Sequence, residues 1–433
     1  MVVFAPVATR SGYGDMSRDL VRHFIEYDKF DVKIISVPWG DTPMNALDED
    51  NPKDKMILDR IFTENFPRQP EIYVHVGVPN EAQPHGKFNI LCTAGIETTV
   101  ASAQWIEACN RMDVVFTISE HSKNVFENSK FSYQTPQGMN GTLELVKPIE
   151  VLHNCIDTNI FGKKAPTDKK FSEVLNVIPE QFCFAFVGHW LRGEYGEDRK
   201  NVSLLIKLFM ETFKQITDKP LPALILKTST SGFSILDREE ILDKIQQLKA
   251  SVNLEGTQKL PNIYLLHGEL TEKEMNTLYN HSKVKAHISL TKGEGFGRPL
   301  LEASVSGKPV IASGWSGHLD FLTPTESLLV GGELKNVHPS SVWENVIMAE
   351  SSWFSPDPQQ CVNAMAAAFL DYNTHKNNAY NLADRNRKQF SYTSIQKRTW
   401  DLLDKYVPEF PKQLPLVLPK LKKLELPKLN KVD

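Results

Sequence analysis

Cysteine is scarce in this chain, which has five cysteines among 433 residues, at positions 92, 109, 155, 183 and 361. The number is odd and no two lie close together in the sequence. This pattern argues against a disulfide framework and against a zinc site. A reducing compartment fits it, so we expect a cytoplasmic protein.

Long hydrophobic runs and an excess of one charge are also missing. No run approaches the roughly eighteen apolar residues of a membrane span. The apolar start, residues 1–8, has no preceding basic region and is too short for a signal-peptide core, so we interpret it as a first strand. Forty-nine basic and fifty-three acidic residues give a net charge of −4, which offers no overall field for nucleic acid.

The composition is that of a soluble globular protein, with 41% hydrophobic and 24% charged residues. A chain of this length is expected to form two domains. Apolar strand-like runs alternate with amphipathic helical segments in both halves, which predicts parallel sheets with helices on both faces. Ligands of such sheets bind beyond the carboxyl ends of the strands, where Gly12, Gly77 and Glu97 are expected to face one crevice.

The segment from 285 to 307 carries the strongest functional pattern. A buried strand is expected at 285–290, a glycine-rich loop at 293–297 and a two-turn helix from Pro299, with Gly307 at its left-handed end. Unpaired amides at a helix start reached through glycines attract a phosphate or diphosphate. Glu294 and Glu302 would border the same ligand. Because carboxylates repel phosphate, they are expected to bind sugar and ribose hydroxyls, which implies a nucleotide sugar.

These residues resemble a known family. The run from Glu294 to Ala303, followed by 307–312, is similar to the Glu-x7-Glu signature of the retaining glycosyltransferases of family 4 (glycosyl transferases group 1), which have the GT-B fold. The resemblance implies that Glu294 contacts the transferred sugar and Glu302 the ribose. It also implies that the diphosphate is held by the backbone amides of the intervening loop, at Gly295, Phe296, Gly297 and Arg298.

An N-terminal turn at 10–14 precedes a helix expected over 15–27. Its glycines, Gly12 and Gly14, mimic a dinucleotide fingerprint, but Asp31 precedes the second strand instead of following it, so NAD is not expected. In the family, a similar loop lies across the cleft near the donor phosphates and the acceptor. A tight turn with no ligand is the other interpretation.

Two further acidic features of the sequence concern the acceptor side and a possible metal site. Many members of the family have a histidine in the N-terminal crevice, whereas here Glu97 is the nearest polar candidate, as an acceptor-side base or a hydrogen-bond partner. The acidic run 48–50 resembles the metal-binding motif of another glycosyltransferase architecture, but it lies in a polar stretch with no strand leading into it. We interpret it as a solvated loop and predict no metal and no cofactor.

Basic residues follow the strand expected at 182–188. The resemblance implies a diphosphate clamp made by Lys200 and a second cation, either Arg192 or Arg199. Fixed cations in a dry cleft would stabilise the negative charge that develops on the leaving nucleoside diphosphate. A solvated basic loop is the alternative.

The predicted architecture is α/β, with two Rossmann-like domains that face each other across a cleft. We expect an acceptor-side domain at 1–165, a donor-binding domain at 166–380 and a helix at 381–407 that crosses back to the first domain. The segment 408–433, rich in Pro and Lys, is expected to be extended or disordered, and it could contact an anionic membrane or a partner.

The expected activity is transfer of a hexose from a nucleotide sugar to an acceptor hydroxyl, with retention of configuration and without metal. The catalytic set would be Glu294, Lys200, Arg199 and Glu97. One alternative is an epimerase or synthase of the same fold. Another, suggested by the missing histidine and the displaced arginine, is a protein that binds nucleotide sugars without turnover. The sequence names neither the sugar, the base nor the acceptor.

Overall fold

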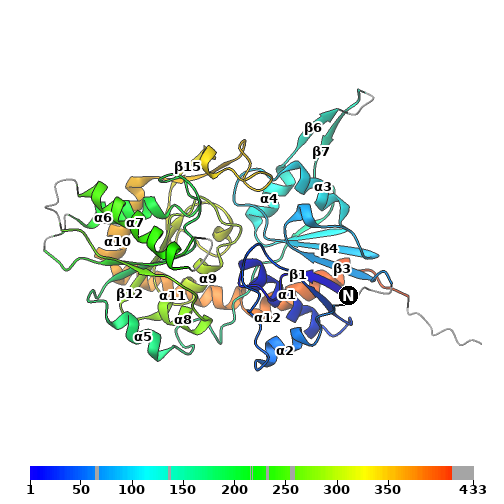
Figure 1. Ribbon diagram of the computed structural model, residues 1–433, viewed down its shortest axis with the longest axis horizontal. Coiled ribbons are helices and arrows are strands. Elements are labelled where there is room, and N and C mark those ends of the chain that lie inside the picture. The colour runs from blue at the N-terminus through cyan, green and yellow to red at the C-terminus, as the bar shows by residue number, and fades with distance from the viewer. Residues whose placement is uncertain are drawn as a thin grey trace, which may run out of the picture.

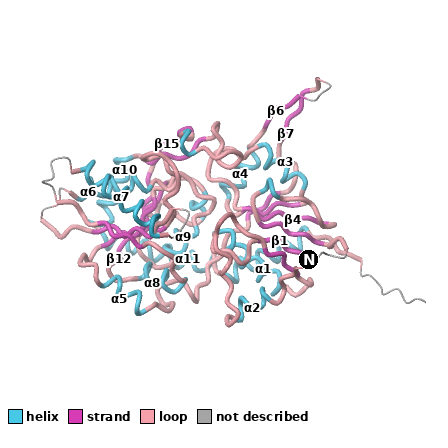
Figure 2. Tube along the Cα trace, in the orientation of Figure 1, coloured by secondary structure: helices cyan, strands magenta, loops and turns pink. Residues whose placement is uncertain are grey.

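The computed structural model describes residues 1–63, 68–134, 138–214, 216, 218–230, 234–253 and 259–411. The described chain forms two lobes side by side, with the N-terminal lobe at the right of Figure 1 and the C-terminal lobe at the left. In both, strands form the centre and helices lie on the outside (Figure 2). The segment predicted as a tail falls outside the described residues from 412 onward.

The N-terminal lobe contains a six-stranded parallel sheet in the order β2-β1-β3-β4-β5-β8. Its strands are β1 (Val2–Ala5), β2 (Lys33–Ser36), β3 (Ile72–Val76), β4 (Phe88–Thr93), β5 (Val114–Thr117) and β8 (Ile149–Val151). The helices around it are α1 (Gly12–Glu26), α2 (Pro52–Leu58), α3 (Ala103–Arg111) and α4 (Glu120–Asn128). A hairpin of β6 (Phe131–Gln134) and β7 (Asn140–Leu143) projects from this lobe (Figure 1).

The C-terminal lobe repeats the plan with the strand order β11-β10-β9-β12-β13-β14, again parallel. Its strands are β9 (Cys183–Val187), β10 (Ala223–Lys227), β11 (Ile263–Leu266), β12 (Val284–Ser289), β13 (Val310–Ser313) and β14 (Leu328–Val330). Its helices are α5 (Lys169–Asn176), α6 (Val202–Phe213), α7 (Ile235–Val252), α8 (Glu272–Asn280), α9 (Arg298–Ser304) and α10 (Pro358–Leu370). A hairpin of β15 (Gly332–Asn336) and β16 (Ser352–Pro356) is added.

The hydrophobic core is continuous between the lobes. One buried cluster begins in the N-terminal sheet, includes Phe296 and Leu300 of the C-terminal lobe, and reaches Phe390. A second cluster lies between the C-terminal sheet and helices α6, α7 and α10. Phe296 packs against Phe321 with ring centroids 5.1 Å apart. Burial of apolar surface is the main contribution that stabilises a fold, so this shared cluster stabilises the packing of the two lobes against each other.

The C-terminal helical region differs from the single crossing helix predicted at 381–407. Two helices, α11 (Tyr372–Gln389) and α12 (Tyr392–Tyr406), meet at Phe390 and Ser391. The break is fixed by Ile156, whose amide donates to the Phe390 carbonyl at 2.8 Å and whose carbonyl accepts from the Tyr392 amide at 3.1 Å. Helix α11 lies on the C-terminal lobe and α12 on α1, where the Trp400 indole donates to the His23 carbonyl at 2.8 Å. The crossing therefore occurs at the break.

Helix α1 starts at Gly12, three residues earlier than the sequence predicts. The Ser11 hydroxyl accepts from the Gly14 amide at 3.0 Å and caps the helix. A Cβ atom on Gly14 would lie 2.2 Å from the Thr9 carbonyl oxygen, so the loop folds back tightly over the first turn. Both glycines therefore lie in the helix rather than in a turn before it. Among the described residues, no helix has the length and apolarity needed to cross a bilayer.

Candidate active site at the interface between the lobes

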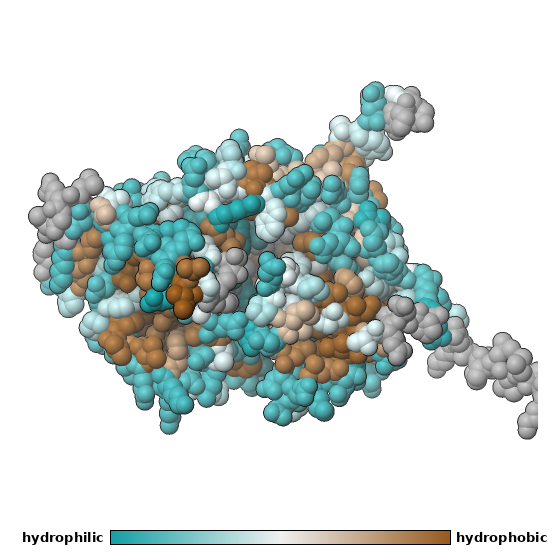
Figure 3. Space-filling model, viewed as in Figure 1, coloured by the Kyte–Doolittle hydropathy of each residue, from teal (hydrophilic) through white to brown (hydrophobic). Residues whose placement is uncertain are grey.

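Loops from both sheets meet where the lobes face each other. A Cβ atom added at Gly293, after β12, would lie 1.9 Å from the carbonyl oxygen of Glu97, after β4. One added at Gly295 would lie 2.6 Å from the Ala94 carbonyl oxygen. These loops follow the carboxyl ends of parallel strands, where such sheets bind ligands. A recessed surface lies between the lobes in the space-filling view (Figure 3).

A buried ion cluster occupies this interface. The Lys200 ammonium forms a short hydrogen bond with one carboxylate oxygen of Glu294, and a guanidinium nitrogen of Arg199 lies 3.4 Å from the other. The same nitrogen lies 3.5 Å from a carboxylate oxygen of Glu97, which belongs to the N-terminal lobe. The cluster thus links the lobes. It brings together all four residues of the predicted catalytic set.

The local fold explains why these side chains converge. The buried Asp198 carboxylate accepts from the Val202 amide at 3.0 Å at the start of α6, which sets the path of the chain through 199–201. The Arg199 carbonyl accepts from the Lys292 amide at 2.8 Å, so a backbone hydrogen bond joins the loops after β9 and β12. Ser316, which the sequence did not single out, accepts from the Glu294 amide at 2.9 Å.

The ion cluster changes the pKa values of its members. Burial acts to raise the pKa of Glu294, but Lys200 and Arg199 outweigh it and lower that pKa to about 2. Burial lowers the pKa of Lys200, against the opposing effect of Glu294. Burial also acts to lower the pKa of Arg199, but Glu97 and Glu294 raise it. Glu294 is therefore ionised at neutral pH and held by both cations.

Glu302 lies in a different set of contacts. Its carboxylate accepts from the Tyr279 hydroxyl at 3.0 Å and from the Arg298 guanidinium at 3.2 Å. The same guanidinium reaches Asp19 of α1, at 3.2 Å. Within the described residues, the side-chain partners of Glu302 and Glu294 do not overlap. Glu302 is thus paired with Arg298 and Tyr279, and Glu294 with Lys200 and Arg199. That both carboxylates border one ligand stays a prediction.

Burial raises the pKa of Glu302 to about 7, against the opposing effect of Arg298. The Arg298 side chain, whose role could not be predicted from the sequence, forms an ion pair between the lobes. Arg298 is the first residue of α9, and Gly297 before it has the left-handed conformation with φ 88°. Burial acts to lower the pKa of Arg298, but Asp15 and Asp19 hold it well above the usual value.

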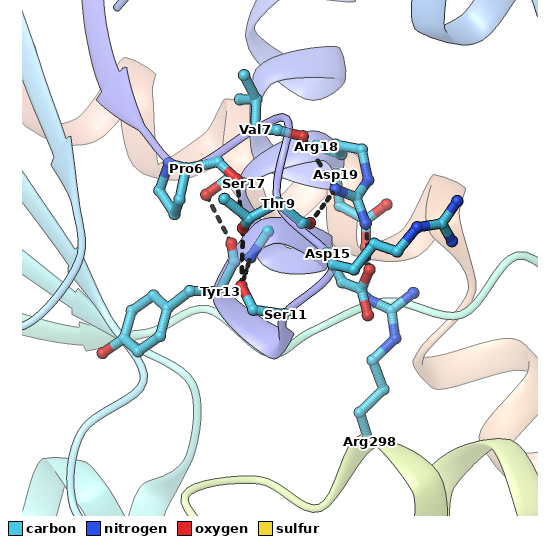
Figure 4. Close-up of polar contacts among 12 residues, drawn as sticks. Pro6, Val7, Thr9, Ser11, Tyr13, Asp15, Ser17, Arg18, Asp19 and Arg298 are labelled. Atoms are coloured by element: carbon cyan, nitrogen blue, oxygen red, sulfur yellow. Dashed lines mark hydrogen bonds and ion pairs between the residues drawn. The ribbon is translucent and has the colours of Figure 1, made fainter. Parts of the chain in front are cut away.

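The loop after β1 lies beside this interface. Figure 4 shows Arg298 near Asp15 and Asp19 of α1. The Arg18 guanidinium donates to the carbonyls of Val7 and Thr9, each at 2.9 Å, and so holds the loop against the helix (Figure 4). Gly12 and Gly14 thus sit in a helix start that faces the C-terminal lobe.

Tyr13 lies between these two glycines, and its hydroxyl accepts from the Ala94 amide at 3.0 Å. It connects the start of α1 with the loop after β4. Burial raises the pKa of Tyr13 to about 12, so the phenol stays protonated at neutral pH. This residue could not be predicted from the sequence, because a tyrosine beside glycines has no distinctive pattern.

Arg192 lies apart from the ion cluster. Its guanidinium donates to the Val342 carbonyl at 2.8 Å and lies 5.3 Å from the centre of the Trp343 ring. Of the two arginines that the sequence offered as second cation, the structure brings Arg199 to Glu294 and places Arg192 on this outer loop. Arg199 reaches Glu294 because the turn at Asp198 directs residues 199 and 200 toward the interface between the lobes.

The acidic run 48–50 is exposed and precedes α2. The Asp50 amide donates to the Asp48 carboxylate at 3.0 Å, which is a local turn contact. Across the part of the chain that the structure describes, no group of three or more His, Cys, Asp or Glu side chains is arranged to hold a metal ion.

Two Rossmann-like lobes with parallel sheets and a site at their interface constitute the GT-B fold. Residues 196–335 match the family model described as Glycosyl transferases group 1. This match contains the ion-cluster residues Arg199, Lys200 and Glu294, and also Glu302. It supports a glycosyltransferase of the GT-B fold. A comparison with curated proteins finds no match.

Solved structures show the same architecture. The Anabaena HepE protein in complex with UDP and glucose has a TM-score of 0.59 and 14% identity, over 93% of this chain and 99% of that one. Sucrose-phosphate synthase from Thermosynechococcus elongatus has a TM-score of 0.61 and 14% identity, over 93% of this chain and 98% of that one. A trehalose-6-phosphate structure from E. coli bound with UDP-2-fluoro glucose has a TM-score of 0.59 and 11% identity, over 95% of this chain and 99% of that one. At these identities the likeness shows the fold.

Proposed function

We propose that this chain transfers a hexose from a nucleoside-diphosphate sugar to an acceptor hydroxyl, with retention of configuration and without a metal ion. The observation that carries the proposal is the buried cluster of Glu294, Lys200 and Arg199 at the interface between the lobes. It lies within the segment that matches the group 1 glycosyltransferase model. Similar folds contain UDP and sugars in HepE and UDP-2-fluoro glucose in the E. coli structure.

In the proposed reaction, the bond between the anomeric carbon and the diphosphate oxygen breaks, and a bond to the acceptor oxygen forms on the same face. The acceptor proton passes to the departing phosphate. Lys200 and Arg199 supply positive charge for the leaving group, a task that a metal ion performs in other architectures. Because both cations are already present in a buried loop, little reorganisation is needed as charge develops. Glu294 would bind hydroxyls of the transferred sugar.

The two lobes have separate roles in this proposal. The C-terminal lobe, at 166–380, binds the donor through Lys200, Arg199 and the loop from Gly295 to Arg298, with Glu302 on the ribose. Glu302 must then give up contacts with Arg298 or Tyr279. The N-terminal lobe, at 1–165, presents Glu97 and the start of α1 to the acceptor. Five free, buried cysteines favour a reducing, cytoplasmic setting.

A panel of nucleotide sugars tests this function. A donor that binds the folded form raises the melting temperature by mass action, and this selects the sugar and base. Release of the nucleoside diphosphate is then measured with candidate acceptors, and the anomeric configuration of the product is read by NMR. Stabilisation with release and a retained anomer is the expected outcome. Stabilisation with no release across the acceptors would instead favour a binding protein, and an isomerised donor would favour an epimerase.

A further inference from the structure

A second charged feature lies on the C-terminal lobe, away from the interface. Lysine side chains gather around two tyrosines of helix α11, and we name this group the α11 lysine cluster. Its members are Lys163, Lys285, Lys308, Lys376, Tyr372 and Tyr380. They come from the segment before α5, from β12, from the turn after α9 and from α11. Four separate parts of the chain thus contribute to one basic surface.

The tyrosine rings hold the lysines together. The ammonium of Lys376 lies 5.6 Å from the centre of the Tyr372 ring and 5.8 Å from that of Tyr380. Lys285 lies 5.8 Å from the Tyr372 ring, and Lys163 lies 4.8 Å from the Tyr380 ring. Lys163 also donates to the Tyr380 hydroxyl at 3.3 Å. Each aromatic ring therefore faces two ammonium groups, which contact it by cation–π attraction.

These lysines lack acidic partners. Within the described residues, no carboxylate oxygen lies within 4.0 Å of the ammonium of Lys163, Lys285, Lys308 or Lys376. Other lysines of the chain form ion pairs, such as Lys244 with Glu240 at 2.6 Å and Lys335 with Glu333 at 3.0 Å. In a chain of net charge −4, an unneutralised group of cations is not explained by composition.

The electrostatics of the cluster agree with its geometry. Burial, followed by the nearby charges of Lys285 and Lys376, lowers the pKa of Lys308 to about 7. Burial acts to raise the pKa of Tyr380, but Lys163 and Lys376 lower it. The Lys308 ammonium donates to the His281 carbonyl at 2.5 Å, which leaves its remaining protons for another acceptor. Like charges held this close repel each other, and a multiply charged anion would relieve that repulsion.

The α11 lysine cluster is distinct from the candidate active site. The ring of Tyr380 packs against Gly307, just beyond the end of α9, where an added Cβ would lie 2.7 Å from the ring. Gly297 precedes the start of the same helix, where an added Cβ would lie 3.5 Å from Glu294. The seven-residue helix is about 10 Å long and separates the two places. Lys285 likewise lies near the beginning of β12, whereas Glu294 follows its end.

We propose that the α11 lysine cluster binds a phosphate-bearing anion with several negative charges. Ammonium groups of Lys285, Lys308 and Lys376 would donate charge-assisted hydrogen bonds, and the hydroxyls of Tyr372 and Tyr380 would add neutral donors. The inference does not depend on the proposed transferase activity. The phosphate could come from a free polyphosphate or sugar phosphate or from an anionic lipid headgroup, since the recognising chemistry is the same.

Calorimetric titration of the full chain with inorganic tripolyphosphate tests the proposal. The variant is Lys285→Gln/Lys376→Gln, and the control is Lys244→Gln/Lys335→Gln, which removes the same charge from paired surface lysines. We expect the first double variant to lose affinity by about tenfold or more, because charge-assisted hydrogen bonds disappear. The control should bind like the wild type. Parallel binding to vesicles of phosphatidylcholine with and without phosphatidylglycerol identifies a headgroup source.

The cleft cations could also attract tripolyphosphate, so the titration is repeated with Lys200→Ala. Binding that persists there and is lost in Lys285→Gln/Lys376→Gln supports the cluster, whatever the outcome of the transferase assays. Binding to vesicles that requires phosphatidylglycerol and these two lysines supports it with a lipid source. An equal loss of affinity in Lys285→Gln/Lys376→Gln and in the control double variant would overturn the proposal. The absence of binding to both tripolyphosphate and the vesicles would also overturn it.

Discussion

Replacing Glu294 with glutamine should expose the energetic importance of the ion cluster. The carboxylate has a folded-state pKa of about 2, against the ordinary pKa of 4.5 for a glutamate side chain. A difference of about 2.5 pKa units corresponds to roughly 3 kcal/mol of stability at neutral pH. The side chain is 8% exposed, so solvent screens the interaction little. In the variant, Lys200 and Arg199 would stay buried with one carboxylate fewer, and the loss should be of this size.

The pH dependence follows from the direction of the shift. Because folding lowers the pKa of Glu294, its contribution is complete above the unfolded pKa and is lost as pH falls toward the folded pKa. The free energy of unfolding of wild type minus that of Glu294→Gln should therefore shrink by about 2 kcal/mol between about pH 7 and about pH 3. Urea unfolding at the two pH values measures this difference.

Glu240→Gln is the matched control, because Glu240 pairs with Lys244 on an exposed face, where its side chain is 58% accessible. Exposed pairs contribute little, so this variant should be close to wild type at both pH values. If Glu294→Gln were as stable as wild type at neutral pH, or if its difference from wild type did not depend on pH, the reasoning about the buried ion cluster would be refuted.

Three further outcomes are expected. Lys200→Ala should weaken donor binding in calorimetry, because a hydrogen bond to a charged group contributes about 1.5 to 3 kcal/mol, and a change below about threefold would argue against a diphosphate contact. Asp19→Asn removes the nearer of the two α1 carboxylates that pair with Arg298 and should lower the free energy of urea unfolding by about 1 to 3 kcal/mol, whereas an unchanged value would show that this pair does not join the lobes. Gly293→Ala should move the two lobes apart, since its Cβ would overlap the Glu97 carbonyl oxygen, and small-angle scattering like that of wild type would contradict this.

Much of the fold could be predicted from local patterns. The apolar runs at 182–188 and 285–290 are strands because their continuous hydrophobicity suits a sheet covered on both faces. The helix break at Phe390 could not be predicted in this way. It depends on hydrogen bonds with Ile156, which is more than 200 residues away in sequence. The single helix expected there follows from local propensity, which long-range contacts override.

The candidate site was predictable in its residue types but not in its pairings. Glu294 and Lys200 were singled out on separate grounds, as a sugar ligand and as a diphosphate cation. Their ion pair joins residues 94 apart and depends on how two loops are joined. For the same reason, the sequence could not show that Arg199 lies beside Glu294 whereas Arg192 lies apart, because this depends on the turn at Asp198.

The glycines illustrate a similar limit. Gly293 and Gly295 read as a phosphate-binding loop, and the structure adds the close approach of the Glu97 and Ala94 carbonyls. A sequence shows that a side chain is missing but not which neighbour needs the space. The contact of Arg298 with Glu302 is a local i, i+4 pair, whereas its contact with Asp19 could not be predicted because Asp19 belongs to the other lobe.

The most direct test of the central claim is the release of nucleoside diphosphate from a nucleotide sugar by the wild type and by Lys200→Met, compared at saturating donor and acceptor. We predict measurable turnover by the wild type and a large loss in the variant, because the leaving diphosphate loses a buried cation. Equal turnover by the two proteins would contradict the account.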